Sequence, residues 1–230
     1  MKNILITLTL ILFSVLAFGQ KTPHVNTGTK GFYFTHLNDT ICTIDTSNFE
    51  LSGNIIQWDD LTASSLSFAG GVNSPTVREV NSQGVFSACY NYQSANDISY
   101  VSLQMSHGYC DGTMVSPHIH YYVEATGSAG DTVVLKITGN WTNIGDTINA
   151  SNTTVETVKI PIAPLIANYI YIYDLPMLTG TGKTFSSQFL YTIERLQNNA
   201  SDNYGNWFCI LDFDIHYKVC HFGTNQEYSR

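Results

Sequence analysis

The chain has 230 residues and a formal net charge of −8, with 12% charged and 13% aromatic residues, fourteen of them Tyr. Only ten Lys and Arg oppose eighteen Asp and Glu, so the chain lacks the cations that neutralise phosphates, which excludes nucleic acid as a partner. With so few charged residues, the polar part of the surface must consist mainly of Ser, Thr and Asn side chains. This composition is typical of exported β-proteins and of assemblies.

Residues 1–20 have the layout of a signal peptide. Lys2 supplies a short positive start, an apolar run extends from Ile4 to Leu16, and Ala17-Phe18-Gly19-Gln20 follows it, with cleavage expected near Gly19 and Gln20. The run is shorter than the roughly 20 apolar residues that span a bilayer, and no later segment is apolar enough to do so. We expect a secreted product, or a virion component, without a stable membrane span. An uncleaved N-terminal anchor is the alternative.

The remaining residues indicate an all-β fold, a β-sandwich or jelly roll of antiparallel strands. Short β-prone runs alternate with Gly, Asn, Asp, Ser and Thr, and no segment has a long helical period. We expect an N-terminal arm with the first strands over residues 21–54, and one sandwich domain over 55–230. The expected strands cover residues 31–34, 85–92, 97–105, 115–124, 132–141, 156–162, 169–175, 186–196 and 207–219.

The cysteines permit disulfides without defining them. An exported chain with five cysteines must leave one thiol free or pair it between chains, and the spacings match no zinc motif. Connectivity cannot be read from the sequence, and simple buried cysteines are an equal alternative. The five are Cys42, Cys89, Cys110, Cys209 and Cys220.

A histidine pair in the strand over 115–124 is the first candidate for a chemical site. His118 and His120 are two residues apart, so a strand aims both imidazoles at the same side, about 6.6 Å apart along the chain. Gly112 before them and Glu124 after them make this stretch similar to the first metal-binding motif of the cupin family. That similarity implies a divalent metal held by His118, His120 and Glu124, with His216 or His221 as a further ligand.

The final strand predicts a second group of polar residues. Asp212, Asp214 and His216 alternate with Phe213 and Ile215, which places the polar and apolar residues on opposite faces. The carboxylates on that polar face either bind calcium or are solvated, and solvation is the simpler interpretation.

No motif predicts catalysis. A Gly-x-Ser-x-Gly elbow is absent, and Gly180 to Thr184 lacks the first glycine and the following helix of a phosphate-binding loop, so a hairpin connection is expected there. Adjacent Asp59 and Asp60 are interpreted as turn residues. We therefore expect no enzyme, and no cofactor beyond a possible divalent metal.

Several phrases in order resemble a family of phage and prophage virion proteins of the tail or head-fibre type. They are Trp58-Asp59-Asp60-Leu61, Gln104-Met105-Ser106-His107, Pro117-His118-Ile119-His120-Tyr121, Phe213-Asp214-Ile215-His216-Tyr217 and the tail from Gly223 to Tyr228. The resemblance implies a symmetric homo-oligomer, such as a trimer, with its histidine strands near a subunit contact. It also implies a structural or receptor-facing role among other virion or cell-surface components.

The functional hypothesis is a non-enzymatic, virion-type or exported structural or binding protein. A cupin-like metal-binding protein or enzyme is the first alternative. A secreted carbohydrate-binding module is the second, with Trp141, Trp207 or Tyr173 stacking on sugar rings, although such aromatics are more often in the core.

Overall fold

The computed structural model describes residues 31–36, 39–45, 49–51, 57–64, 74–80, 82, 84–93, 97–149 and 153–220, with the backbone alone for the first three stretches. The expected signal peptide, most of the expected arm, and His221 lie outside this part of the chain. No helix long and apolar enough to cross a membrane occurs in the residues that are described.

Thirteen strands and no helix make up the described residues, which confirms the all-β prediction. The strands are β1 (Gly31–His36), β2 (Asp39–Asp45), β3 (Phe49–Leu51), β4 (Gln57–Ser64), β5 (Thr76–Val80), β6 (Val85–Tyr90), β7 (Ile98–Gln104), β8 (Ser116–Val123), β9 (Thr132–Thr142), β10 (Thr153–Pro161), β11 (Tyr171–Asp174), β12 (Gln188–Arg195) and β13 (Phe208–Val219). All nine predicted strands are present, whereas β2, β3, β4 and β5 were not predicted.

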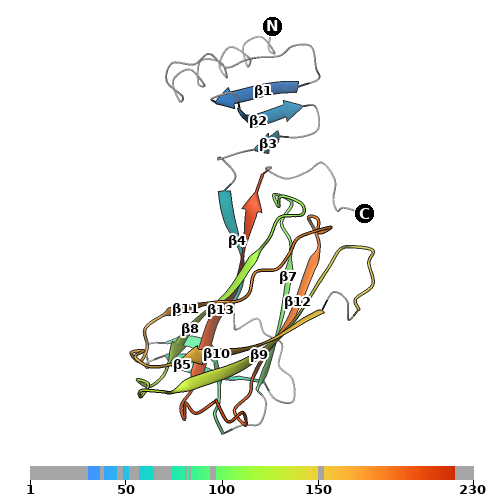
Figure 1. Ribbon diagram of the computed structural model, residues 1–230. Coiled ribbons are helices and arrows are strands. Elements are labelled where there is room, and N and C mark those ends of the chain that lie inside the picture. Colours follow the sequence, from blue (N-terminus) through green and yellow to red (C-terminus); the bar gives the residue numbers. More distant parts are fainter. Residues whose placement is uncertain are drawn as a thin grey trace.

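Two antiparallel sheets form the sandwich. One has the order β10-β9-β12-β7, and the other has the order β11-β8-β13-β6-β5 with β4 also paired to β13. The strands β1, β2 and β3 form a separate small sheet. In Figure 1, β13 is the long strand along which β4 and β8 run.

The core lies between the two sheets and is built by simple alternation. Val133, Leu135 and Ile137 of β9 and Phe189 and Ile193 of β12 are buried on the inner face of the four-stranded sheet. The intervening residues of these strands turn outward. Because the period is two, the outer faces of both sheets remain available for polar chemistry.

A β-bulge at Leu211 changes the alternation within β13. Phe208 and Ile210 face the core, and after the bulge Phe213 and Ile215 face it. The extra residue, Leu211, packs on the outside in a second cluster with the Cys89 and Cys209 disulfide. Without this one-residue shift, Asp214 and His216 would point into the core, so the bulge determines the outward direction of the histidine–aspartate face.

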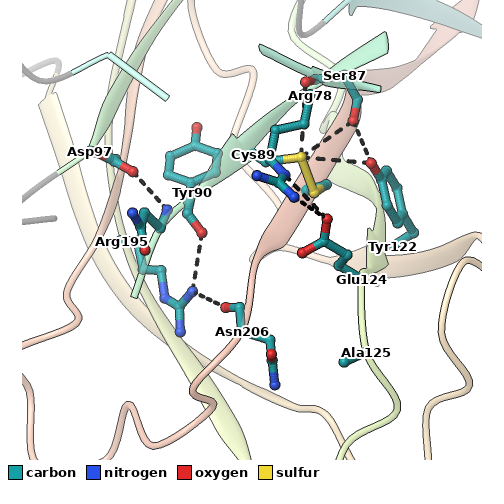
Figure 2. The surroundings of a disulfide bond; sticks show 12 residues. Arg78, Ser87, Cys89, Tyr90, Asp97, Tyr122, Glu124, Ala125, Arg195 and Asn206 are labelled. Atoms are coloured by element: carbon teal, nitrogen blue, oxygen red, sulfur yellow. Dashed lines mark hydrogen bonds and ion pairs between the residues drawn. A yellow bond between two sulfur atoms is a disulfide. The ribbon is translucent and has the colours of Figure 1, made fainter. Parts of the chain in front are cut away.

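Two disulfides connect distant parts of the chain. Cys89 of β6 bonds to Cys209 of β13, and Cys110, which follows β7, bonds to Cys220 at the end of β13. Figure 2 shows the first of them, with Ser87 and Tyr122 beside its sulfur. The interpretation of all the cysteines as simple buried thiols is therefore wrong for these four.

Two other local expectations are corrected by the topology. Asp59 and Asp60 lie within β4 and not in a turn. Gly180 to Thr184 belongs to a connection between β11 and β12, which are in different sheets, so it is not a hairpin.

Candidate metal centre

The outer face of the six-stranded sheet brings the two predicted histidines together with an aspartate of the neighbouring strand. The register pairs His118 of β8 with Asp214 of β13 and His120 with Asp212. The Nε2 atoms of His118 and His120 are 3.1 Å apart, and Oδ2 of Asp214 is 3.6 Å from each of them. The three side chains thus each direct one potential ligand atom toward a shared position between them.

The size of this triangle fits a tetrahedral metal ion. Ligand atoms about 2.0 to 2.1 Å from a tetrahedral zinc-like ion are about 3.3 Å from one another. The three observed separations, 3.1, 3.6 and 3.6 Å, lie on either side of that value. Without a metal, the two imidazoles can share one N–H···N hydrogen bond, but 3.6 Å is too long for either of them to donate to Asp214.

Burying the Asp214 carboxylate costs free energy unless a positively charged group lies beside it. Its exposed fraction is 5%, and its Oδ1 atom is buried without a hydrogen bond among the described residues. A buried carboxylate is stable only where a cation or several hydrogen-bond donors face it. The expectation that the Asp212 and Asp214 carboxylates are both simply solvated is therefore wrong for Asp214.

The environment keeps His118 neutral. Burial is the main cause of a lowered pKa for His118, and the charges of His216 and His120 lower it further, while Asp214 and the backbone of Ser116 oppose the shift. The exposed fraction of His118 is 2%, and its Nδ1 makes no hydrogen bond of ordinary geometry within the described part of the chain. A neutral imidazole has the free lone pair that a metal requires.

His216 lies beside this triangle but is directed elsewhere. Its ring centroid is 4.2 Å from that of His118, yet its Nε2 is 2.9 Å from Oδ1 of Asp60 on β4. Asp212 lies across from His120, and burial followed by the charge of Asp214 raises the pKa of Asp212. His216 and Asp212 therefore lie next to the triangle but contribute no ligand atom to it.

Glu124 is not brought to the cluster. It shares the outer face of the sheet with His120, but Tyr122 lies between them on that face and Arg78 of β5 holds the Glu124 carboxylate at 2.5 Å. Figure 2 shows this pair next to the Cys89 disulfide. Asp214 takes the place that the spacing suggested for Glu124.

The sequence alone could have indicated Asp214 only through the pairing of two strands. Its strand was predicted, and its polar face was recognised. The register that puts it opposite His118 joins positions that are 96 residues apart (214 − 118), and no local pattern determines that register.

The aromatic residues expected for sugar stacking do not form an exposed platform. Trp141 is buried, with an exposed fraction of 5%, and Trp207 is partly buried under the Arg78 guanidinium, 4.4 Å from its ring. Tyr173 is also partly buried and packs against the core.

No family model and no curated protein matches the chain. Solved structures with some likeness include the enzymatically active domain of bacteriophage CBA120 tailspike protein 4, with TM-score 0.37 and 10% identity over 70% of this chain and 19% of that one. A cellulose-specific carbohydrate-binding module of type CBM28 has TM-score 0.33 and 9% identity, over 71% and 86%. The infectious bursal disease virus Gx strain has TM-score 0.33 and 8% identity, over 86% and 38%.

The chain thus spans about a fifth of the length of the tailspike domain. Likenesses of this size carry no argument on activity, substrate or partner.

Proposed function

We propose that this protein is an exported, non-catalytic structural or binding protein, of a virion or a cell surface, whose β-sandwich holds one divalent transition metal at His118, His120 and Asp214. The observation that carries the proposal is the triangle of two imidazole nitrogens and one carboxylate oxygen, with edges of 3.1, 3.6 and 3.6 Å.

The donor set selects the class of metal. Two imidazoles with one carboxylate suit zinc and similar transition metals, whereas calcium and magnesium prefer a shell of oxygen atoms. The lowered pKa of His118 keeps this ligand deprotonated near neutral pH. We therefore expect zinc, or another ion of that class, to bind in preference to calcium.

The surroundings of the site favour a structural role over catalysis. A catalytic metal needs an open coordination position inside a pocket that receives a substrate. Two cavities over the described residues are lined by β7, β9, β10 and β12 and by residues 178–183, and none of the three ligands lines either of these two. A metal here would connect β8 to β13 on the outer side of the sheet, where His120 is the one partly exposed ligand of the three.

Three ligands from one chain leave the fourth tetrahedral position for another group. The side chains of His120 and His216 are 28% and 44% exposed, so a second molecule can approach the site from outside. We propose that a neighbouring copy covers this face in a symmetric homo-oligomer. Low surface charge limits the repulsion between such copies.

Metal content and native mass, measured together on the mature chain purified without chelators, test the proposal. We expect one transition metal per chain in a symmetric oligomer, and loss of the metal in His120→Ala and in Asp214→Asn. The matched control is Glu124→Gln, which removes a charge from the same sheet face but should leave the metal content unchanged.

A folded oligomer without metal, or one that keeps its metal in both ligand variants, would contradict the proposed site. A monomer that binds one metal and converts a small substrate would instead support a cupin-like enzyme.

A further inference from the structure

A groove of about 520 Å³ lies on the outer face of the other sheet, away from the histidine cluster. Its outward-facing lining comes from all four strands of that sheet and consists of Tyr100, Ser102, Thr138, Asn140, Thr153, Leu190 and Thr192. None of these side chains is ionisable at neutral pH.

The strand register explains why uncharged polar side chains lie together on this face. In one row across the sheet, Tyr100 of β7 is paired with Thr192 of β12, which is paired with Thr138 of β9. In the next row, Ser102 pairs with Leu190, and Leu190 with Asn140. Two adjacent rows therefore present hydroxyl groups around one aromatic ring and one leucine, above the buried Asn140 amide.

The charged side chains nearest to these two rows lie in the row beside them. Lys136 and Glu194 are paired to each other in the row beside Thr138 and Thr192, with 3.4 Å between their charged atoms. Because this pair is internally neutralised, the groove offers no cation to a phosphate, sulfate or carboxylate ligand. An anionic ligand is therefore a poor match for the surface.

The lining is also held in place before any ligand arrives. Nδ2 of Asn140 donates to the backbone oxygen of Asn149 and to Oγ1 of Thr153, at 3.1 and 3.0 Å. By contrast, Tyr100 has an exposed fraction of 46%, which leaves its ring available for contact. A fixed polar floor beside an exposed ring is the arrangement that reduces the entropy lost on binding.

From this geometry we infer that the groove binds a neutral oligosaccharide. A sugar ring offers an apolar face of C–H groups, which an aromatic ring can contact, and a rim of hydroxyls, which Ser and Thr side chains can hydrogen-bond. The inference does not depend on the metal, because the groove and the histidine cluster lie on different sheets.

Isothermal titration of the metal-loaded, full-length mature protein tests the inference. The probes are cello-, xylo-, manno- and chito-hexaose, with hexagalacturonate as the anionic control. We expect at least one neutral hexaose to bind and the anionic one not to bind. Tyr100→Ala should weaken that binding about tenfold by loss of the ring contact, and Thr138→Lys should weaken it by placing a charge in the groove.

Tyr169→Ala is the matched control, because Tyr169 is 61% exposed and lies outside the groove; its affinity should equal that of the wild type. The inference is overturned if no neutral hexaose binds, or if Tyr100→Ala binds as tightly as the wild type. It is also overturned if Tyr100→Ala lowers the native mass, because the face is then a contact between copies.

Discussion

Arg195 is the residue whose role is least visible in the sequence and most defined in the structure. It is fully buried at the end of β12, and all five of its N–H groups have a partner. Two are accepted by the Asp202 carboxylate, and the others by the backbone oxygens of Tyr90, Tyr204 and Asn206. Figure 2 shows Arg195 between Tyr90 and Asn206. One guanidinium therefore joins three segments of chain at one end of the sandwich.

Replacement of Arg195 by Met should lower the free energy of unfolding by about 3 to 5 kcal/mol, because Asp202 is left as a buried charge without its partner. Denaturant unfolding followed by tryptophan fluorescence measures this. Arg78→Met is the control, since the Arg78 and Glu124 side chains are each 36% exposed and such a pair contributes about 1 kcal/mol or less. Equal losses in the two variants would contradict the role assigned to Arg195.

At the scale of the strands, alternation predicts which side chains share a face of a strand, but not which other strand it pairs with. The nine predicted strands are apolar enough, or regular enough, to be recognised. The strand β4 reads Gln-Trp-Asp-Asp-Leu-Thr-Ala-Ser and is mostly exposed, and β5 lies at the edge of its sheet. The strand β4 depends on its pairing with β13, which is far away in the sequence. Among the described strands, β5 pairs only with the adjacent β6 and has a mostly exposed face, so local propensity indicates neither β4 nor β5.

The same limit applies to the candidate site. The shared face of His118 and His120 follows from period two, and so does the polar face of Asp212, Asp214 and His216. Which member of one face meets which member of the other depends on the register of β8 against β13 and on the bulge at Leu211. Glu124 has a suitable spacing, but Arg78 of β5 holds it, and β5 was not among the predicted strands.

The disulfides connect elements that alternation alone leaves independent. Cys89 and Cys209 close a loop with a sequence separation of 120 residues, and the chain-entropy view gives long loops the larger effect. We expect the double variant Cys89→Ala/Cys209→Ala to lose about 2 to 4 kcal/mol of unfolding free energy in denaturant titrations.

Peptide mapping without reduction is the companion measurement for the disulfides. It should yield the two linked pairs Cys89–Cys209 and Cys110–Cys220. Linkage of Cys89 to Cys110, or a double variant as stable as the wild type, would contradict this account.

The whole molecule has a core rich in tyrosine, and this predicts its response to alkali. Burial raises the pKa of Tyr109, Tyr121 and Tyr217 to about 12. The unfolded chain therefore loses these phenolic protons near pH 10, while the folded chain still keeps them. Stability is fully present below pH 10 and is lost as the pH rises from about 10 to about 12.

We expect the free energy of unfolding to fall over that range by at most about 1.4 kcal/mol per pH unit for each of these tyrosines. Tyrosinate absorbance and circular dichroism, followed together in a pH titration, check this. Coincident ionisation and unfolding agree with the account. Ionisation of these tyrosines near pH 10 in a chain that remains folded would contradict it.

The central claim is that two sheet strands hold one metal ion on the outer face of the sandwich. Anomalous diffraction from a crystal of the zinc-loaded protein, recorded on both sides of the zinc absorption edge, tests it most directly. We predict one peak per chain, about 2.0 to 2.2 Å from Nε2 of His118, Nε2 of His120 and a carboxylate oxygen of Asp214. A zinc-loaded crystal with no peak there, or with its peak at Glu124, would contradict the claim.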